Sequence, residues 1–165
     1  EMIIKDCTLK EIGVIGTKAT IDSGIYKEKI NQYCSEISVK SHPTPLLAPM
    51  VEEGFFDQEI SRSIIKKYLT HNSLKNISTL ILGCTHYPLI KDEIIKFYNN
   101  QLNVIDSSEI VSQSIFEDLK KSKLISDLEK PTYHFIVSNY TKSFEKSAHF
   151  FFKENIKLEE LDIWV

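Results

Sequence analysis

The stretch that decides the fold is Ser78-Thr79-Leu80-Ile81-Leu82-Gly83-Cys84-Thr85-His86-Tyr87-Pro88, an apolar run followed directly by polar residues and a proline. A short continuous apolar run predicts a buried strand, and the proline fits the first turn of a following helix. In open α/β sheets, ligands bind just outside the carboxyl ends of the strands. The sequence therefore predicts that Cys84 lies in a cleft at one edge of a sheet.

Strands and helices alternate on both sides of this stretch. The predicted strands are 12–17, 36–41, 78–82, 103–106, 132–138 and 161–165. The predicted helices are 23–33, 57–70, 88–98, 107–123 (capped by Ser107 or Ser108) and 140–155. Residues 42–53 contain three prolines and are predicted to form a loop. This alternation favours an α/β fold with a mainly parallel sheet flanked by helices.

The composition is that of an ordinary globular protein. The 165 residues are 42% hydrophobic and 26% charged, and the net charge is −3 without a basic block. Nucleic acid is therefore not an expected partner, and no apolar stretch approaches the length of a membrane span. The three scattered cysteines favour reduced thiols and a cytoplasmic location over a disulfide framework. The chain opens at Glu1 and reaches a predicted strand within a dozen residues, which resembles the interior of a longer protein.

Cys84 and His86 are the first candidates for chemistry. A thiol at a strand end, with an imidazole two residues away, can serve as a base or a nucleophile. Thr85 and the backbone N–H groups near a helix start suit a carboxylate ligand. The alternative is a buried cysteine that acts as a small hydrophobe. Its position at the end of the strand, and not within it, favours a functional Cys84.

The other polar groups carry weaker signals. No metal is expected, because a structural zinc site needs about four closely spaced Cys or His ligands and the cysteines lie far apart. Glu52 and Glu53 end the proline-containing segment, where solvated acids are common, although the prolines would fix the course of the backbone. Asp22-Ser23-Gly24 could bind an anion, but a helix N-terminus at Ser23 explains it fully.

Three blocks of the sequence resemble the glutamate racemases of the aspartate/glutamate racemase superfamily, in the family's order. They are residues 12–17 followed by Ala19-Thr20, residues 44–54, and the highly specific Leu82-Gly83-Cys84-Thr85-His86-Tyr87-Pro88-Leu89. Asp106 and the later Ile136-Val137-Ser138 extend the likeness over nearly the whole chain.

The resemblance implies a cofactor-independent enzyme that interconverts L- and D-glutamate and supplies D-glutamate for peptidoglycan. In this family two cysteines flank the substrate Cα, and one removes a proton while the other returns one to the opposite face. Cys84 matches the second cysteine, with His86 and Glu52 beside it as the expected catalytic set. The expected substrate-binding residues are Thr85, His86 and Thr17. Histidine at position 86 favours glutamate as the substrate, because aspartate racemases typically carry a glutamate residue at this position.

The family's amino-terminal half has no counterpart in this sequence. Its Ala-Cys-Asn-Thr-like segment with the first catalytic cysteine is absent, and Asp22-Ser23-Gly24 cannot stand in for its Asp-Ser-Gly substrate turn, because this tripeptide belongs to the block that begins at Ile12. The resemblance implies that residues 1–112 form the second α/β domain and that residues 113–165 return to pack on the first. The expected partners are glutamate and the missing domain, with a homodimer left open. The chain alone is expected to be inactive.

Other classes of function stay open at this point. One is a binding module that holds an acidic ligand without turnover, or a racemase of another acidic amino acid. Another is a cysteine hydrolase or transferase with Cys84 as nucleophile and His86 as base. Against the latter, an imidazole two residues from the sulfur in an extended turn seldom aligns for proton abstraction, and no orienting acid is evident.

Overall fold

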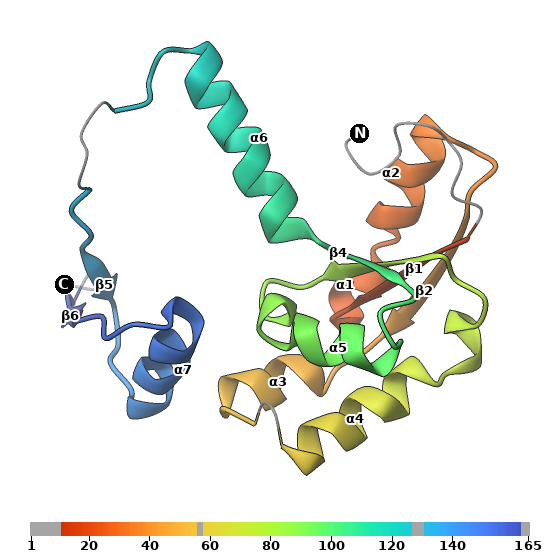
Figure 1. Cartoon of the computed structure of the whole chain (residues 1–165), viewed down its shortest axis with the longest axis horizontal. Coiled ribbons are helices and arrows are strands. Elements are labelled where there is room, and N and C mark those ends of the chain that lie inside the picture. The colour runs from red at the N-terminus through yellow and green to blue at the C-terminus, as the bar shows by residue number, and fades with distance from the viewer. Residues whose placement is uncertain (1–10, 56–57, 127–130, 163–165) are drawn as a thin grey trace.

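A four-stranded parallel sheet forms the centre of the structure, a computed structural model that describes residues 11–55, 58–126 and 131–162 (Figure 1). The order of its strands is β2-β1-β3-β4. The strands are β1 (Glu11–Gly16), β2 (Ser38–Pro43), β3 (Thr79–Gly83) and β4 (Asn103–Asp106). The connecting helices are α1 (Lys18–Asp22), α2 (Ile25–Tyr33), α3 (Leu47–Glu52), α4 (Glu59–Leu69), η1 (Asn72–Leu74), η2 (Tyr87–Ile90) and α5 (Lys91–Phe97). The predicted mainly parallel sheet flanked by helices is confirmed.

The register of the sheet brings the carboxyl ends of the strands to one edge. Gly16 at the end of β1 lies opposite Pro43 of β2 and Gly83 of β3, and Leu82 lies opposite Asp106 of β4. The residues that follow each strand therefore meet at the same edge, where α/β proteins bind ligands.

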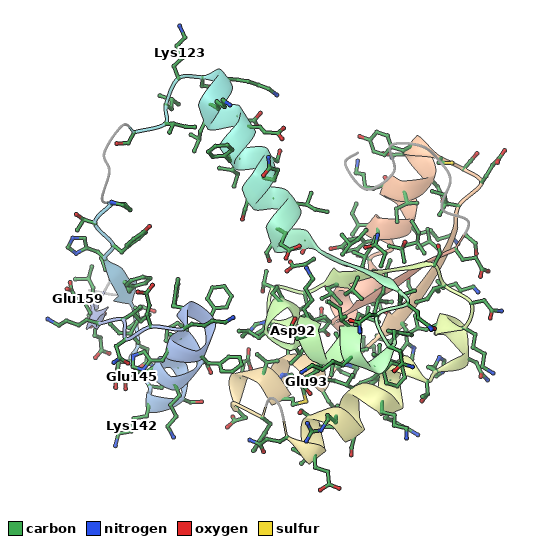
Figure 2. All side chains as sticks on the ribbon, in the orientation of Figure 1. Asp92, Glu93, Lys123, Lys142, Glu145 and Glu159 are labelled. Atoms are coloured by element: carbon green, nitrogen blue, oxygen red, sulfur yellow. The ribbon has the colours of Figure 1, made fainter. Side chains whose placement is uncertain are left out.

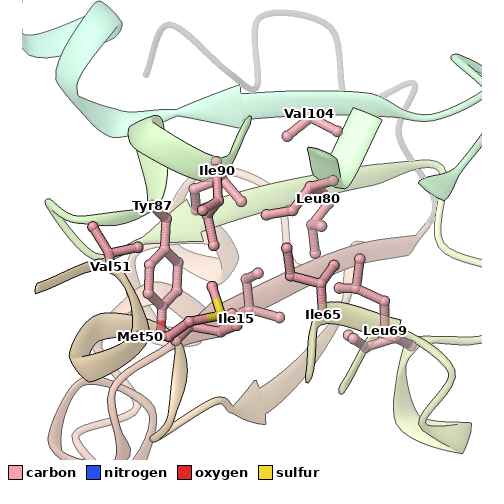
Figure 3. Close-up of a cluster of buried hydrophobic side chains, with 13 residues drawn as sticks. Ile15, Met50, Val51, Ile65, Leu69, Leu80, Tyr87, Ile90 and Val104 are labelled. Atoms are coloured by element: carbon pink, nitrogen blue, oxygen red, sulfur yellow. The ribbon is translucent and has the colours of Figure 1, made fainter. Parts of the chain in front are cut away.

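Apolar side chains cover both faces of the sheet. One cluster joins Ile15, Leu80 and Leu82 to α3, α4, η2 and α5, and Figure 3 shows this packing. A smaller cluster on the other face joins Ile12, Val14 and Ile81 to the end of α2. Burial on both faces explains why β3 reads as a continuous apolar run and not as an alternating pattern.

A second, smaller unit follows the sheet. The helix α6 (Ser107–Lys121) starts directly at the end of β4, without a connecting loop, and contains no buried residue. Beyond it, β5 (Phe135–Val137) and β6 (Leu158–Glu160) form a two-stranded parallel sheet around α7 (Lys142–Phe152). Figure 1 shows α6 projecting away from the main sheet and α7 lying close to α3. The Ser143 hydroxyl joins the two units by donating to the Glu52 carbonyl at 3.0 Å.

The structure corrects the prediction of a loop at residues 42–53. β2 extends to Pro43, and Leu47–Glu52 form the helix α3. Pro49 lies in the first turn of α3, where the missing N–H has no intrahelical partner to lose. The helix buries Leu47, Met50 and Val51, and this burial outweighs the loop preference of the prolines.

Several predicted boundaries also differ. The helix predicted from Pro88 begins as the short 3₁₀ turn η2 before α5, and α1 was not predicted. Asp106, and not Ser107 or Ser108, caps α6, because its carboxylate accepts the Ser108 N–H at 2.7 Å. The last strand lies at Leu158–Glu160 and not at 161–165, and residues 163–165 lie outside the described residues. Asp57, where the helix 57–70 was predicted to begin, also lies outside them. Among the helices of the described segments, none combines the length and the apolar character needed to cross a membrane.

Candidate functional site

Gly83 and the turn after it place Cys84 at the end of the central strand β3. A Cβ atom on Gly83 would lie 2.9 Å from the Ile15 carbonyl oxygen and 3.2 Å from the ring of Tyr26, so only glycine fits without movement. The Tyr87 N–H then donates to the Cys84 carbonyl at 3.2 Å, which closes the turn into η2. The thiol is partly buried at the edge where the strands end.

Cys84, His86 and Glu52 form a continuous line of polar contacts. The Cys84 Sγ lies 3.6 Å from His86 Nδ1, and His86 Nε2 lies 3.0 Å from Glu52 Oε1. When Nε2–H donates to the carboxylate, Nδ1 presents its lone pair to the sulfur. The imidazole can then accept the thiol proton, and Glu52 can stabilise the resulting imidazolium.

The surroundings of Cys84 favour the protonated thiol. Partial burial raises the pKa of Cys84, a hydrogen bond with the His86 backbone lowers it, and the nearby Glu52 carboxylate raises it further. The net direction is upward, so the sulfur carries a proton at neutral pH. This is the form that donates a proton, and a nearby positive charge would be needed to favour the thiolate.

The other two predicted site residues, Thr17 and Thr85, lie at the same edge of the sheet, and neither hydroxyl is hydrogen-bonded to the Cys84 thiol. Thr17 follows β1, is partly buried, and caps α1 by accepting the Thr20 N–H at 3.3 Å. Thr85 is exposed between Cys84 and His86. The structure therefore groups Cys84, His86 and Glu52 in direct contact, and it leaves both threonine hydroxyls near the strand ends.

Sequence reasoning missed further residues around the thiol. The ring of Tyr26 in α2 packs against Gly83, and burial together with the Cys84 charge raises the pKa of Tyr26, while a hydrogen bond with Ser107 lowers it. Thr44 and Ser107 directly follow β2 and β4. Applying the strand-end rule to every strand would have found these two, whereas nothing local in the sequence indicates Tyr26.

A cavity of about 490 Å³ opens beside the imidazole. Glu52, His86 and Leu89 line it from the main unit, and Phe144, Ser147 and Phe151 line it from α7. The cavity thus lies between the two units, next to the Cys84–His86–Glu52 line. In residues 11–55, 58–126 and 131–162, no group of three or more His, Cys, Asp or Glu side chains is arranged to hold a metal ion.

The chain is similar to known racemases over nearly all of its length. It is 39% identical over 163 residues to a glutamate racemase of Persephonella marina, which covers 99% of this chain and 60% of that protein. No family model matches the sequence.

Solved structures give the same result. The crystal structure of the Francisella tularensis glutamate racemase in complex with D-glutamate has a TM-score of 0.82 and 36% identity, and covers 93% of this chain and 58% of that one. A Bacillus anthracis glutamate racemase, RacE1, has a TM-score of 0.84 and 31% identity, with coverages of 96% and 60%. In sequence and in fold, the chain therefore matches the carboxyl-terminal portion of glutamate racemases, and it spans about 60% of the length of such relatives.

Proposed function

We propose that this chain supplies one half of the active site of a cofactor-independent glutamate racemase. Cys84 would exchange a proton with one face of the substrate Cα, and His86 and Glu52 would move and stabilise that proton. The observation that carries the proposal is the line of contacts at 3.6 Å and 3.0 Å through Cys84, His86 and Glu52 at the end of β3. The similarity to glutamate racemases supports assigning this line of contacts to proton transfer at the substrate Cα.

The chemistry explains why such a line is needed. The α-proton of an amino acid is feebly acidic, so the transition state resembles a carbanion and needs donors arranged in advance on the carboxylate. The hydroxyls of Thr17 and Thr85, at neighbouring strand ends, are the proposed substrate contacts. The protonated Cys84 is suited to return a proton, and in the reverse direction the ammonium group of the substrate would favour its thiolate.

Glutamate is the proposed substrate, and D-glutamate for peptidoglycan the proposed product. The D-glutamate bound to the Francisella relative and the histidine at position 86 support this choice over aspartate. The free thiols of Cys34 and Cys84 support a reducing compartment such as the cytoplasm.

A complementary lobe with the second thiol completes the proposal. The apolar residues Val111, Ile115, Phe116 and Leu119 of α6 are 39–54% exposed, and Figure 2 shows the side chains of this helix projecting into open space. Exposed apolar faces of this kind mark interaction surfaces. In this proposal residues 1–112 form one lobe, and residues 113–165 pack on the complementary lobe that the longer relatives have room to contain.

The structure weakens one argument against a cysteine hydrolase or transferase. Sequence reasoning found no acid to orient the imidazole, but Glu52 lies 3.0 Å from His86 Nε2. The argument against a cysteine hydrolase or transferase is therefore the similarity of the chain to racemases, and no longer the lack of an acid beside His86.

The test measures racemisation with and without the complementary lobe. The chain is incubated with L-glutamate in D₂O, and loss of the α-proton and formation of D-glutamate are followed by NMR and chiral chromatography. We expect no racemisation by the chain alone, and activity after fusion to the amino-terminal part of the Persephonella relative. Cys84→Ala should abolish that activity. Racemisation by the chain alone would refute the half-site, and an active Cys84→Ala fusion would refute the role of Cys84.

Binding without turnover distinguishes the remaining alternative. If the fusion binds glutamate in calorimetry but neither racemises it nor exchanges its α-proton, the protein is an acidic-ligand module. If it racemises aspartate faster than glutamate, the substrate assignment is wrong.

A further inference from the structure

Two buried hydroxyl groups connect three strand ends beneath the candidate site. Tyr87 and Thr44 are both fully buried, and Tyr87 Oη lies 2.6 Å from Thr44 Oγ1. Tyr87 Oη also lies 3.1 Å from the Thr44 carbonyl oxygen, to which it can donate. The Thr44 hydroxyl and N–H donate to the Gly16 carbonyl at 3.2 Å and 2.8 Å. Figure 3 shows the Tyr87 ring inserted between Val51 and Met50.

Each connected segment leads directly to a candidate site residue. Gly16 precedes Thr17, and Tyr87 follows His86. The Thr44 carbonyl accepts the Leu47 N–H at 3.1 Å and so starts the turn into α3, which ends at Glu52. One small network therefore fixes the relative positions of the ends of β1, β2 and β3.

The polar line at the site cannot supply this positioning by itself. The side chains of His86 and Glu52 are 37% and 59% exposed, and an exposed contact of this kind contributes little in water, whether or not the imidazole is charged. The contact between Cys84 and His86 is also long, at 3.6 Å. A hydrogen bond in the low-dielectric core is electrostatically stronger, and a polar group left unpaired there is costly.

We propose that Tyr87 and Thr44 are positioning residues, whose paired hydroxyls hold the Cys84 turn against α3 so that His86 stays between Cys84 and Glu52. Their effect on proton transfer rests on the proposed racemase function. Their effect on the exposure of the Cys84 thiol does not, so it can be measured on this chain alone.

The test is alkylation of individual cysteines by iodoacetamide at pH 8, followed by peptide mass spectrometry on the intact 165-residue chain. Tyr87→Phe and Thr44→Val each remove one hydroxyl and nearly preserve shape. Thr44→Ser retains the hydroxyl. Tyr98→Phe is the matched control, because the Tyr98 hydroxyl is buried without a hydrogen-bond partner.

We expect Cys84 to react at least about fivefold faster in Tyr87→Phe and Thr44→Val, because each variant removes two contacts and the loss of one hydrogen bond already corresponds to about fivefold. The loosened turn admits water and reagent to the sulfur. Cys34, which is buried on the other face of the sheet, is the internal reference and should keep its rate. Thr44→Ser and Tyr98→Phe should match the parent chain.

Two results would overturn the proposal. One is an unchanged Cys84 rate in both hydroxyl-removing variants. The other is a parallel increase at Cys34, which would mean that the pair only stabilises the whole fold.

The active fusion gives a second measurement. There, Tyr87→Phe should lower kcat about tenfold with little change in KM, because a positioning defect acts on the transition state. A pure KM effect would refute the positioning role. A fusion that is inactive even with both hydroxyls present would refute the proposed racemase function and leave the alkylation result standing.

Discussion

Replacing Gly83 by alanine tests whether the close approach of β1 and β3 determines the position of Cys84. The new Cβ would lie 2.9 Å from the backbone oxygen of Ile15 and 3.2 Å from the ring of Tyr26, and real Cβ atoms essentially never show contacts under 3.0 Å. The carbonyl belongs to β1, which lies between β2 and β3 in the sheet, and cannot rotate away. The two strands must therefore separate by a few tenths of an ångström.

The expected cost follows from two opposing effects. Overpacking a well-filled site costs about 1–3 kcal/mol. The alanine also restricts the unfolded chain, which returns about 0.4–1 kcal/mol. The net loss in the free energy of unfolding is then about 1–2 kcal/mol, or a decrease of about 1 M in the urea midpoint.

The matched control is Gly13→Ala in the same strand pair. Its Cβ would meet Ile77 Cδ1 at the shorter distance of 2.7 Å, with Leu80 and Leu74 methyl groups at 3.1 and 3.3 Å. All three neighbours are ends of flexible side chains that can move, so the smaller loss is expected at Gly13. Urea unfolding followed by far-UV circular dichroism measures both variants. A larger loss for Gly13→Ala than for Gly83→Ala would refute the argument from backbone rigidity.

Three further measurements test the core, the thiol and the buried phenols. Ile90→Ala should cost about 2–5 kcal/mol in urea unfolding, because Ile90 is fully buried in the main cluster; a cost below 1 kcal/mol would contradict that packing. Glu52→Gln removes a charge that raises the pKa of Cys84, so alkylation of Cys84 at pH 8 should become faster, and a slower reaction would reverse the assigned sign. Burial raises the pKa of Tyr87 and of Tyr98 to about 12, so both should ionise last in an absorbance titration. Because the folded state keeps both phenols protonated, their contribution to the free energy of unfolding is complete below pH 10 and is lost as the pH rises through 12. If both phenols ionised near pH 10, together with the exposed tyrosines, that result would contradict their burial.

The parts of the fold that were predicted correctly have local signals. β3 was predicted because its residues are apolar without interruption, and β4 because a short apolar run ends at Asp106. α3 was not predicted, because Pro45 and Pro49 are typical of a loop and the burial of one face of this helix is seen only in the tertiary structure.

The residues of the candidate site also differ in whether the sequence could predict them. Cys84 and His86 could be predicted from their position after a strand. The prolines had drawn attention to Glu52, but its place beside Cys84 and His86 came only from the family resemblance, since it lies far from His86 in sequence and meets it through the packing of α3. The Tyr87–Thr44 pair spans 43 residues and joins two segments with no shared sequence pattern, so only the three-dimensional structure reveals it.

Because no loop separates β4 from α6, a change of angle at the base of the helix moves its whole length. Its 15 residues extend about 22 Å from the sheet, and its base is anchored by the Asp106 cap and by Lys91 Nζ, which lies 2.7 Å from Glu109 Oε1. A rotation of about 5° at this base would displace the far end by about 2 Å, given that length. Small changes in the ion pairs of Lys91 would therefore be magnified along α6. If the proposed complementary lobe packs on α6, its angle to the sheet would depend on the contacts at the base of this helix, which include the Asp106 cap and the ion pairs of Lys91 with Asp106 and Glu109.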